Sequence, residues 1–342
     1  MIRRLWMNTL LVAGLCAGMF MGCSGSKEAD ASSRIVWPPA PDTPRVQYVR
    51  TLKGEDDFSA GIGGVLNTIA GKKGVAKFLR PFDVCVAGDG RIYVTDAMQG
   101  LILYDMKKKE VQPIGENVTV ELKDPRGVAY GHGKVYVGVV SLGQVVIIDD
   151  QGNYAGRIGR QDQFKNPVDV VVDTIRSRVY VVDNHLHTVF VYSEAGDSLF
   201  TIGRRGSKEG DFNYPQSAAV DRQGNLYVVD AFNFRIEVFD TTGKFLRMFG
   251  KQGDAYGTFA RPKGIALDND GNIYVLDGLH NNFQIFNNAG ELLMFVGRFS
   301  PNNDGFQDPV SIAIDARNMI YVTDNLNSRI QMFQLLQTES PK

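Results

Sequence analysis

The feature that most restricts how this chain can fold is a repeat that runs through most of its 342 residues. Six prolines each open a short apolar segment, and neighbouring prolines are 42 to 48 residues apart: Pro81, Pro125, Pro167, Pro215, Pro262 and Pro309. Six Tyr-Val pairs keep step with them: Tyr93, Tyr136, Tyr180, Tyr227, Tyr274 and Tyr321. Two independent markers in step over six copies indicate one structural unit repeated six times.

Within each unit the pattern is that of β-strands rather than helices. In the fifth unit "GIALD", "IYVLD", "NFQIF" and "LLMFVG" are short apolar or alternating segments, and they are separated by turn-forming stretches such as "NDGN" and "NAGE". Four short antiparallel strands in about 45 residues are typical of a β-propeller blade. The sequence therefore predicts an all-β fold, a six-bladed β-propeller with four-stranded antiparallel blades.

The last unit lacks a fourth strand, because "RIQMFQ" is followed only by a polar tail. A spare strand, "RVQYVRTLKG" at residues 45–54, stands before the first unit. We expect this N-terminal strand to complete the last blade and to remove the open sheet edge that would otherwise remain. The predicted propeller then covers residues 45–334, with blades starting near 81, 125, 167, 215, 262 and 309 and a C-terminal tail at 335–342.

The repeat resembles the NHL repeat, the unit of a family of six-bladed propellers, in the pattern P-x-G-I/V-A-x-D followed by G-N-I-Y-V-x-D-x-x-N-x-R-I-Q-x-F. Units four and six fit best. Unit two departs with Val139 in place of the acid, and unit five has His280 and Asn282 where Asn and Arg usually stand. NHL propellers commonly act as interaction platforms, so the resemblance implies that role.

The N-terminus is a different kind of sequence. Residues 1–22 have a basic start and then an apolar stretch too short for a comfortable membrane span, which is typical of an export signal. The ending "FMGC" resembles the lipobox of bacterial lipoproteins, which implies lipidation of Cys23. Residues 23–44 then form a polar and Pro-rich tether. We expect an exported protein that is lipid-anchored in the outer membrane and faces the periplasm or the cell surface; the alternative is an ordinary secretory signal.

Composition narrows the classes of partner. The formal net charge is −1, with no concentrated basic run, so nucleic acid is not an expected partner. Three scattered cysteines, Cys16, Cys23 and Cys85, are too few for a disulfide framework or a cysteine metal site.

One face of the predicted propeller, here called the top face, carries the loops between second and third strands and the connections that lead into each first strand. Functional residues of such a scaffold usually lie in its loops. A ring at the channel mouth contains Asp83 and Asp169, which either cap local amides or bind a cation such as calcium. Phe82, Arg126 and Lys263 directly follow three of the prolines and complete the candidate contact residues at this mouth.

Three histidines fall in top-face loops: His185, His187 and His280. They are a conceivable zinc set, although solvated loop histidines are the interpretation that we favour. No cofactor is expected, and zinc and calcium are the two metals considered.

An Asp and an Arg five residues apart recur in two of these loops, Asp230 with Arg235 and Asp324 with Arg329. We expect each pair to hold its loop in place, because a catalytic carboxylate would not recur from blade to blade. The long connection at residues 55–80 includes "IGGVLNTIAGKKG", which could form one or two helical turns and serve as a channel plug, a lid or a docking segment.

The functional hypothesis is a membrane-anchored envelope lipoprotein whose propeller is a scaffold for other envelope proteins. The alternative is a metal-dependent lyase or hydrolase acting at the top mouth, which would need His185, His187 or His280. A third hypothesis is binding of sugar or peptidoglycan by exposed aromatic residues such as Phe82 and Phe232. The motifs of a nucleophile elbow, a P-loop and a dinucleotide site are absent from the sequence.

Overall fold

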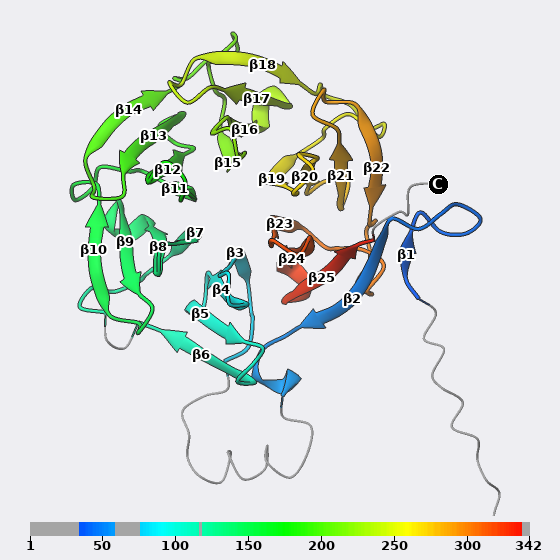
Figure 1. Ribbon diagram of the computed structural model, residues 1–342, viewed down its shortest axis with the longest axis horizontal. Helices are drawn as coiled ribbons and strands as arrows, with labels where there is room; N and C mark the ends of the chain where they lie inside the picture. Colours follow the sequence, from blue (N-terminus) through cyan, green and yellow to red (C-terminus); the bar gives the residue numbers. More distant parts are fainter. Residues whose placement is uncertain (1–33, 59–75, 116–117, 337–342) are drawn as a thin grey trace, which may run out of the picture. The chain divides into compact units, whose positions relative to one another are not determined.

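The computed structural model describes residues 34–58, 76–115 and 118–336. Within them, antiparallel sheets are arranged radially as six blades around a central axis (Figure 1). The predicted all-β six-bladed propeller is therefore confirmed. The export signal, Cys23, residues 59–75 and the last six residues lie outside the described residues.

Every first strand begins at one of the six repeat prolines and lies nearest the axis in Figure 1. These inner strands are β3 (Pro81–Val86), β7 (Pro125–Gly131), β11 (Pro167–Asp173), β15 (Pro215–Val220), β19 (Pro262–Leu267) and β23 (Pro309–Ile314). The second strands are β4 (Arg91–Asp96), β8 (Lys134–Val139), β12 (Arg178–Asp183), β16 (Leu226–Asp230), β20 (Ile273–Asp277) and β24 (Met319–Asp324).

The third strands are β5 (Gly100–Asp105), β9 (Gln144–Asp149), β13 (Thr188–Ser193), β17 (Arg235–Phe239), β21 (Asn282–Phe286) and β25 (Arg329–Leu335). The outer strands are β6 (Glu110–Ile114), β10 (Tyr154–Ile158), β14 (Ser198–Ile202), β18 (Phe245–Phe249), β22 (Leu292–Val296) and β2 (Val46–Leu52). The described residues also contain four short 3-10 turns: η1 (Glu55–Asp57), η2 (Val140–Leu142), η3 (Ala231–Asn233) and η4 (Asn325–Asn327).

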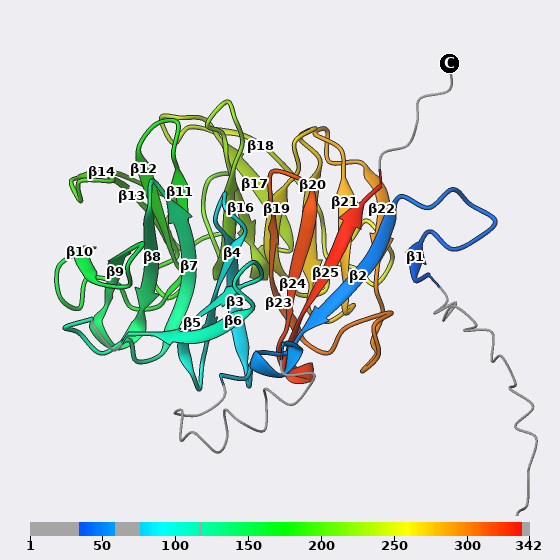
Figure 2. The same cartoon turned by 60° about the horizontal axis from the view of Figure 1, so that its bottom comes forward.

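The N-terminal strand closes the ring as the repeat predicts. Strand β2 pairs antiparallel with β25, with Leu52 opposite Ile330 and Val46 opposite Leu335. Figures 1 and 2 both show the blue β2 alongside the red β25. The last blade is thus built from the two ends of the folded unit.

The folded unit includes residues before 45, within the segment that the sequence predicts as a tether. It begins at Ile35, and a short strand, β1 (Val36–Trp37), pairs with β2 as a fifth strand of the last blade. The Trp37 ring meets the Phe333 ring edge-on with centroids 5.6 Å apart. Packing of this partly buried indole against the last blade extends the fold into the Pro-rich segment.

The core lies between blades rather than at the axis. Six buried clusters each combine side chains from two neighbouring blades. Second and third strands such as β16 and β17 are buried along their whole length, whereas the outer strand β18 alternates between more and less exposed residues. This gradient follows from position, because second and third strands have a neighbouring blade on both faces, whereas an outer strand borders solvent.

The apolar-Gly step that ends the outer strands has a packing reason. Gly203 has φ +78°, and a Cβ built there would lie 2.2 Å from the ring of the buried Phe212. Only glycine combines that backbone angle with such a close approach. Gly159, Gly250 and Gly297 meet Phe164, Phe259 and Phe306 in the same way.

Candidate functional site

The strand pairing places the repeat prolines and the loops after the second strands at one end of the blades. Pro81 is opposite Asp96, Pro215 is opposite Asp230, and Pro309 is opposite Asp324. The top face defined from the sequence is therefore a single face of the propeller, and it is the place to look for a site.

The acid that ends most second strands is buried and structural. Asp96 Oδ2 accepts hydrogen bonds from the amides of Leu79 and Arg80, and Oδ1 accepts from those of Met98 and Gln99. Asp183 and Asp277 bind four backbone amides of their own blades in the same manner. Each carboxylate thus joins two top-face loops. This explains why it recurs, and its oxygens are already engaged.

In the fourth and sixth blades the same acid binds the arginine five residues later. Arg235 Nε donates to Asp230 Oδ2 at 2.9 Å, and Arg329 Nε donates to Asp324 Oδ2 at 2.7 Å. Both pairs are buried. Burial raises the pKa of Asp230 even though Arg235 and the neighbouring donors act to lower it. Each arginine also donates to a carbonyl oxygen of the connection that leads into its blade, so the pair holds two loops together.

At the channel mouth, Asp83 and Asp169 bind the neighbouring inner strands. Asp83 accepts from the Val84 amide, from the Val128 amide and from the Ser311 hydroxyl at 2.8, 2.6 and 2.5 Å. Asp169 Oδ2 accepts from the Ser217 hydroxyl and the Ala218 amide at 2.7 and 2.8 Å. These bonds join one blade to the next around the axis, so amide capping accounts for the engaged carboxylate oxygens.

The pKa values of both mouth carboxylates are raised. Burial raises the pKa of Asp83 to about 6, against hydrogen bonds that lower it. Burial, and then the charge of Asp83, raises the pKa of Asp169 well above its usual range. The cavity between them measures about 20 Å³, which is room for a single water molecule.

The basic residues of the rim already have partners. The Arg126 guanidinium lies 4.7 Å from the centre of the Phe82 ring and 2.9 Å from Asp124 Oδ1. Lys263 Nζ lies 2.7 Å from Asp308 Oδ1, and burial lowers the pKa of this lysine. Phe82 is half-buried under Arg126, so it is a poorer exposed aromatic than the sequence suggests.

The three histidines lie in different environments. His185 is exposed, whereas His187 is buried and its Nδ1 accepts the Tyr214 amide at 3.1 Å. Burial lowers the pKa of His187. His280 Nδ1 is 3.4 Å from Asp277 Oδ2 without the geometry of a hydrogen bond. The expectation of solvated loop histidines is wrong for His187, because it supports the backbone of the next blade.

The histidines do not form the trio that a zinc set requires. In the part of the chain that the structure describes, no group of three or more His, Cys, Asp or Glu side chains is placed to hold a metal ion.

The top face carries exposed apolar residues, of which only Phe232 was expected from the sequence. Met98, Phe232, Leu279 and Leu326 are 67, 53, 61 and 60% exposed. Each lies two residues after the buried acid of its blade, at the tip of the loop between second and third strands. We call these four residues the apolar ring. The signal was available as a fixed offset from Asp96, Asp230, Asp277 and Asp324, but exposure could not be inferred from it.

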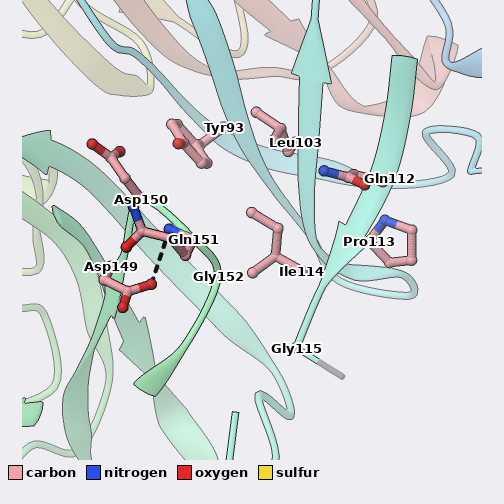
Figure 3. A pocket seen from close by; sticks show the side chains of 10 residues that line it. All are labelled: Tyr93, Leu103, Gln112, Pro113, Ile114, Gly115, Asp149, Asp150, Gln151 and Gly152. Atoms are coloured by element: carbon pink, nitrogen blue, oxygen red, sulfur yellow. Dashed lines mark hydrogen bonds between the residues drawn. The ribbon is translucent and has the colours of Figure 1, made fainter. Parts of the chain in front are cut away.

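The two acids that line a side groove between the first two blades are already engaged. Figure 3 shows its lining side chains, with Tyr93, Leu103 and Ile114 facing Asp149 and Asp150 across a space of about 190 Å³. Asp150 Oδ1 binds Arg91 Nη2 at 2.6 Å, and Asp149 Oδ1 accepts the amide of Gln151 within its own turn. These acids therefore stabilise a turn and an ion pair.

Comparisons with known proteins support the fold. A family profile described as "6-bladed beta-propeller" (DUF5128) matches residues 168–236 and 223–286. None of the curated proteins compared matches the chain.

Several solved structures have the same fold at low sequence identity. A streptogramin B lyase is 13% identical, with a TM-score of 0.58, over 78% of this chain and 85% of that one. A Bacteroides thetaiotaomicron protein of unknown function is 17% identical, with a TM-score of 0.59, over 76 and 70% of the two chains. An auxiliary nutrient binding protein of the same organism is 17% identical, with a TM-score of 0.57, over 75 and 69%. At these identities the likeness concerns the propeller alone.

None of the helical segments among the described residues has the length and apolar character needed to span a membrane.

Proposed function

We propose that this protein is a non-enzymatic lipoprotein of the cell envelope whose top face docks another envelope protein. The observation that carries the proposal is the apolar ring, in which four large side chains are exposed at equivalent positions of four loops. Exposed apolar groups gathered on one face with polar surroundings are typical of protein–protein interaction sites. The repeats, which resemble the NHL type, are expected to serve as the platform.

Support for the membrane location comes from the N-terminal sequence. Residues 1–22 have the pattern of an export signal, and Cys23 stands where a lipobox cysteine is acylated. Several acyl chains on one residue hold a protein stably at a membrane, whereas one chain does not. We place the propeller at the outer membrane, tethered by the residues that precede Ile35. In Cys23→Ser the protein should lose incorporation of a clickable palmitate analogue and leave the membrane fraction; unchanged labelling would contradict the assignment.

The docking role is tested with two matched variants of the full-length chain. The ring variant replaces Met98, Phe232, Leu279 and Leu326 with Ser. The control replaces three residues of the outer strands, Leu199, Leu246 and Leu293, which are 46, 49 and 43% exposed, also with Ser. Both sets remove exposed apolar surface, but only the first lies on the top face.

Cells producing each form are treated with a membrane-permeable crosslinker, and the envelopes are then solubilised and the tagged protein purified. We expect one or more envelope proteins to crosslink to the wild type and the control but not to the ring variant. Circular dichroism and the melting temperature verify that all three proteins are folded. Equal crosslinking of the ring variant and the wild type would overturn the proposal.

A further inference from the structure

An aromatic cluster lies on the top face where the third and fourth blades meet. The Tyr214 ring is at its centre, with the Phe232 ring centroid 4.9 Å away and tilted by 42°. The His185 ring meets Tyr214 edge-on at 6.2 Å. These residues come from three segments: the loop after β12, the residue before Pro215, and η3. We call His185, Tyr214 and Phe232 the aromatic platform.

The platform is held rigidly from its buried side. His187, only 6% exposed, lies 4.7 Å from Tyr214 between ring centroids, and its Nδ1 accepts the Tyr214 amide. The outer side is open, since His185 is exposed and Phe232 is 53% exposed. Among the six residues that precede the repeat prolines, only Tyr214 is aromatic; the others are Arg80, Asp124, Asn166, Arg261 and Asp308. The platform is thus particular to one blade junction.

Two amide side chains lie close to these rings in the sequence and keep hydrogen-bonding capacity. Asn184, next to His185, is only 6% exposed, and its Oδ1 accepts Asn166 Nδ2 at 2.9 Å. The Nδ2 of Asn184 has no hydrogen-bond partner among the described residues, so this amide keeps free donors. Gln216, two residues after Tyr214, lines the mouth cavity, and its side chain is likewise unbonded within the described ranges.

The nearby carboxylates are committed elsewhere. Asp183 accepts from four amides, and Asp230 binds Arg235, Asn233 and the Asn213 amide. Both are fully buried. A ligand on the platform therefore meets aromatic faces flanked by amide, imidazole and phenol groups, with the exposed Arg205 close enough to His187 to lower its pKa.

We propose that the aromatic platform binds a pyranose ring of a neutral saccharide. A pyranose with equatorial hydroxyls, such as β-linked glucose or N-acetylglucosamine, has apolar C–H groups on its faces and hydroxyls at its edge. Its face suits the Phe232 and Tyr214 rings, and its edge suits the amides of Asn184 and Gln216. This inference shares Phe232 with the proposed protein docking, but it depends on the geometry of the aromatic rings, whereas docking depends on exposed apolar surface.

Titration calorimetry of the full-length protein, held in a detergent without a sugar headgroup, tests the inference. The ligands are cellohexaose and chitohexaose. The key variant is Phe232→Leu, because leucine already stands at the equivalent positions 279 and 326. This change removes the aromatic face but keeps an apolar side chain, so the apolar ring remains available for protein docking. Tyr256→Phe and Tyr256→Leu are the matched controls at another exposed aromatic residue, which is 58% exposed.

We expect at least one hexasaccharide to bind with a Kd of about 1 mM or tighter, within the range of weak specific binding. Phe232→Leu should weaken that binding at least tenfold, and Asn184→Ala should weaken it at least threefold. Both Tyr256 variants should bind within twofold of the wild type. Absence of binding by both sugars would overturn the inference, as would unchanged binding by Phe232→Leu. Phe232-dependent binding of a proline-rich peptide without any saccharide binding would also overturn it, since the occupant would then be a peptide.

Discussion

The ion pair of the last blade offers the sharpest test of the loop-holding role of the recurrent acid. Asp324 is fully buried and Arg329 is 5% exposed. Besides the 2.7 Å bond to Asp324, Arg329 Nη2 donates to the carbonyl oxygens of Asn302 and Gly305 at 2.6 and 3.1 Å. Asp324 Oδ1 accepts the Gln307 amide at 2.7 Å. One pair therefore connects the loop after β24 with the connection that leads into β23.

In Asp324→Ala the buried Arg329 guanidinium keeps its hydrogen bonds to two carbonyl oxygens but loses its counter-charge. The Gln307 amide also loses its hydrogen-bond acceptor. Removing one partner of a buried pair costs about 3–5 kcal/mol of the free energy of unfolding. Arg329→Met removes the charge while keeping an unbranched apolar side chain. In the double variant neither charge is left buried alone, so we expect its loss to be smaller than the sum of the single losses by about 2 kcal/mol.

Equilibrium urea denaturation of the four proteins, followed by far-UV circular dichroism, measures these losses. Lys77→Ala is the control, because the Lys77–Asp56 pair is 2.6 Å long but about half exposed, and such pairs contribute roughly 0–1 kcal/mol. An Asp324→Ala variant within 1 kcal/mol of the wild type, or single losses that simply add, would refute the reasoning.

Three further predictions follow from packing and burial. Gly203→Ala should lower the free energy of unfolding by about 3 kcal/mol, because it adds both left-handed backbone strain and a clash with Phe212. Gly271, with φ +81° and open space around it, is the control, and Gly271→Ala should lower the free energy of unfolding by only about 1–2 kcal/mol. Equal losses in urea denaturation would contradict the clash. Leu52→Ala should cost about 2–5 kcal/mol, because Leu52 is fully buried where β2 closes the ring, and a loss below 1 kcal/mol would argue against this closure. Burial raises the pKa of Asp83 from its usual 3.8 to about 6 in the folded protein. Between these two pKa values the folded protein retains a proton that the unfolded chain releases. The free energy of unfolding should therefore fall by about 3 kcal/mol as pH rises from about 4 through 6. Urea denaturation at several pH values in this range measures how the free energy of unfolding depends on pH. This dependence should be weaker for Asp83→Asn than for the wild type, and an unchanged dependence would contradict the assignment.

The sequence was sufficient for those features that the repeat itself encodes. The period and the missing fourth strand of the last unit predict six blades and their closure by residues near the N-terminus, and β2 pairs with β25 accordingly. The Asp–Arg offset of five predicts two loop pairs, because both partners lie within one hairpin and their distance depends on local geometry alone.

Only the tertiary structure decided which side chains are covered and by what. His187 follows the histidine pattern of an exposed loop, yet it is buried against Tyr214, which belongs to the next blade. Met98 and Leu326 occupy corresponding loop tips of two blades and stay exposed, whereas Trp37 packs onto Phe333, almost three hundred residues away along the chain. The physical reason is that periodicity and offsets reflect hydrogen bonding within a blade, whereas burial depends on contacts between segments that are distant in sequence and that meet only when the ring closes.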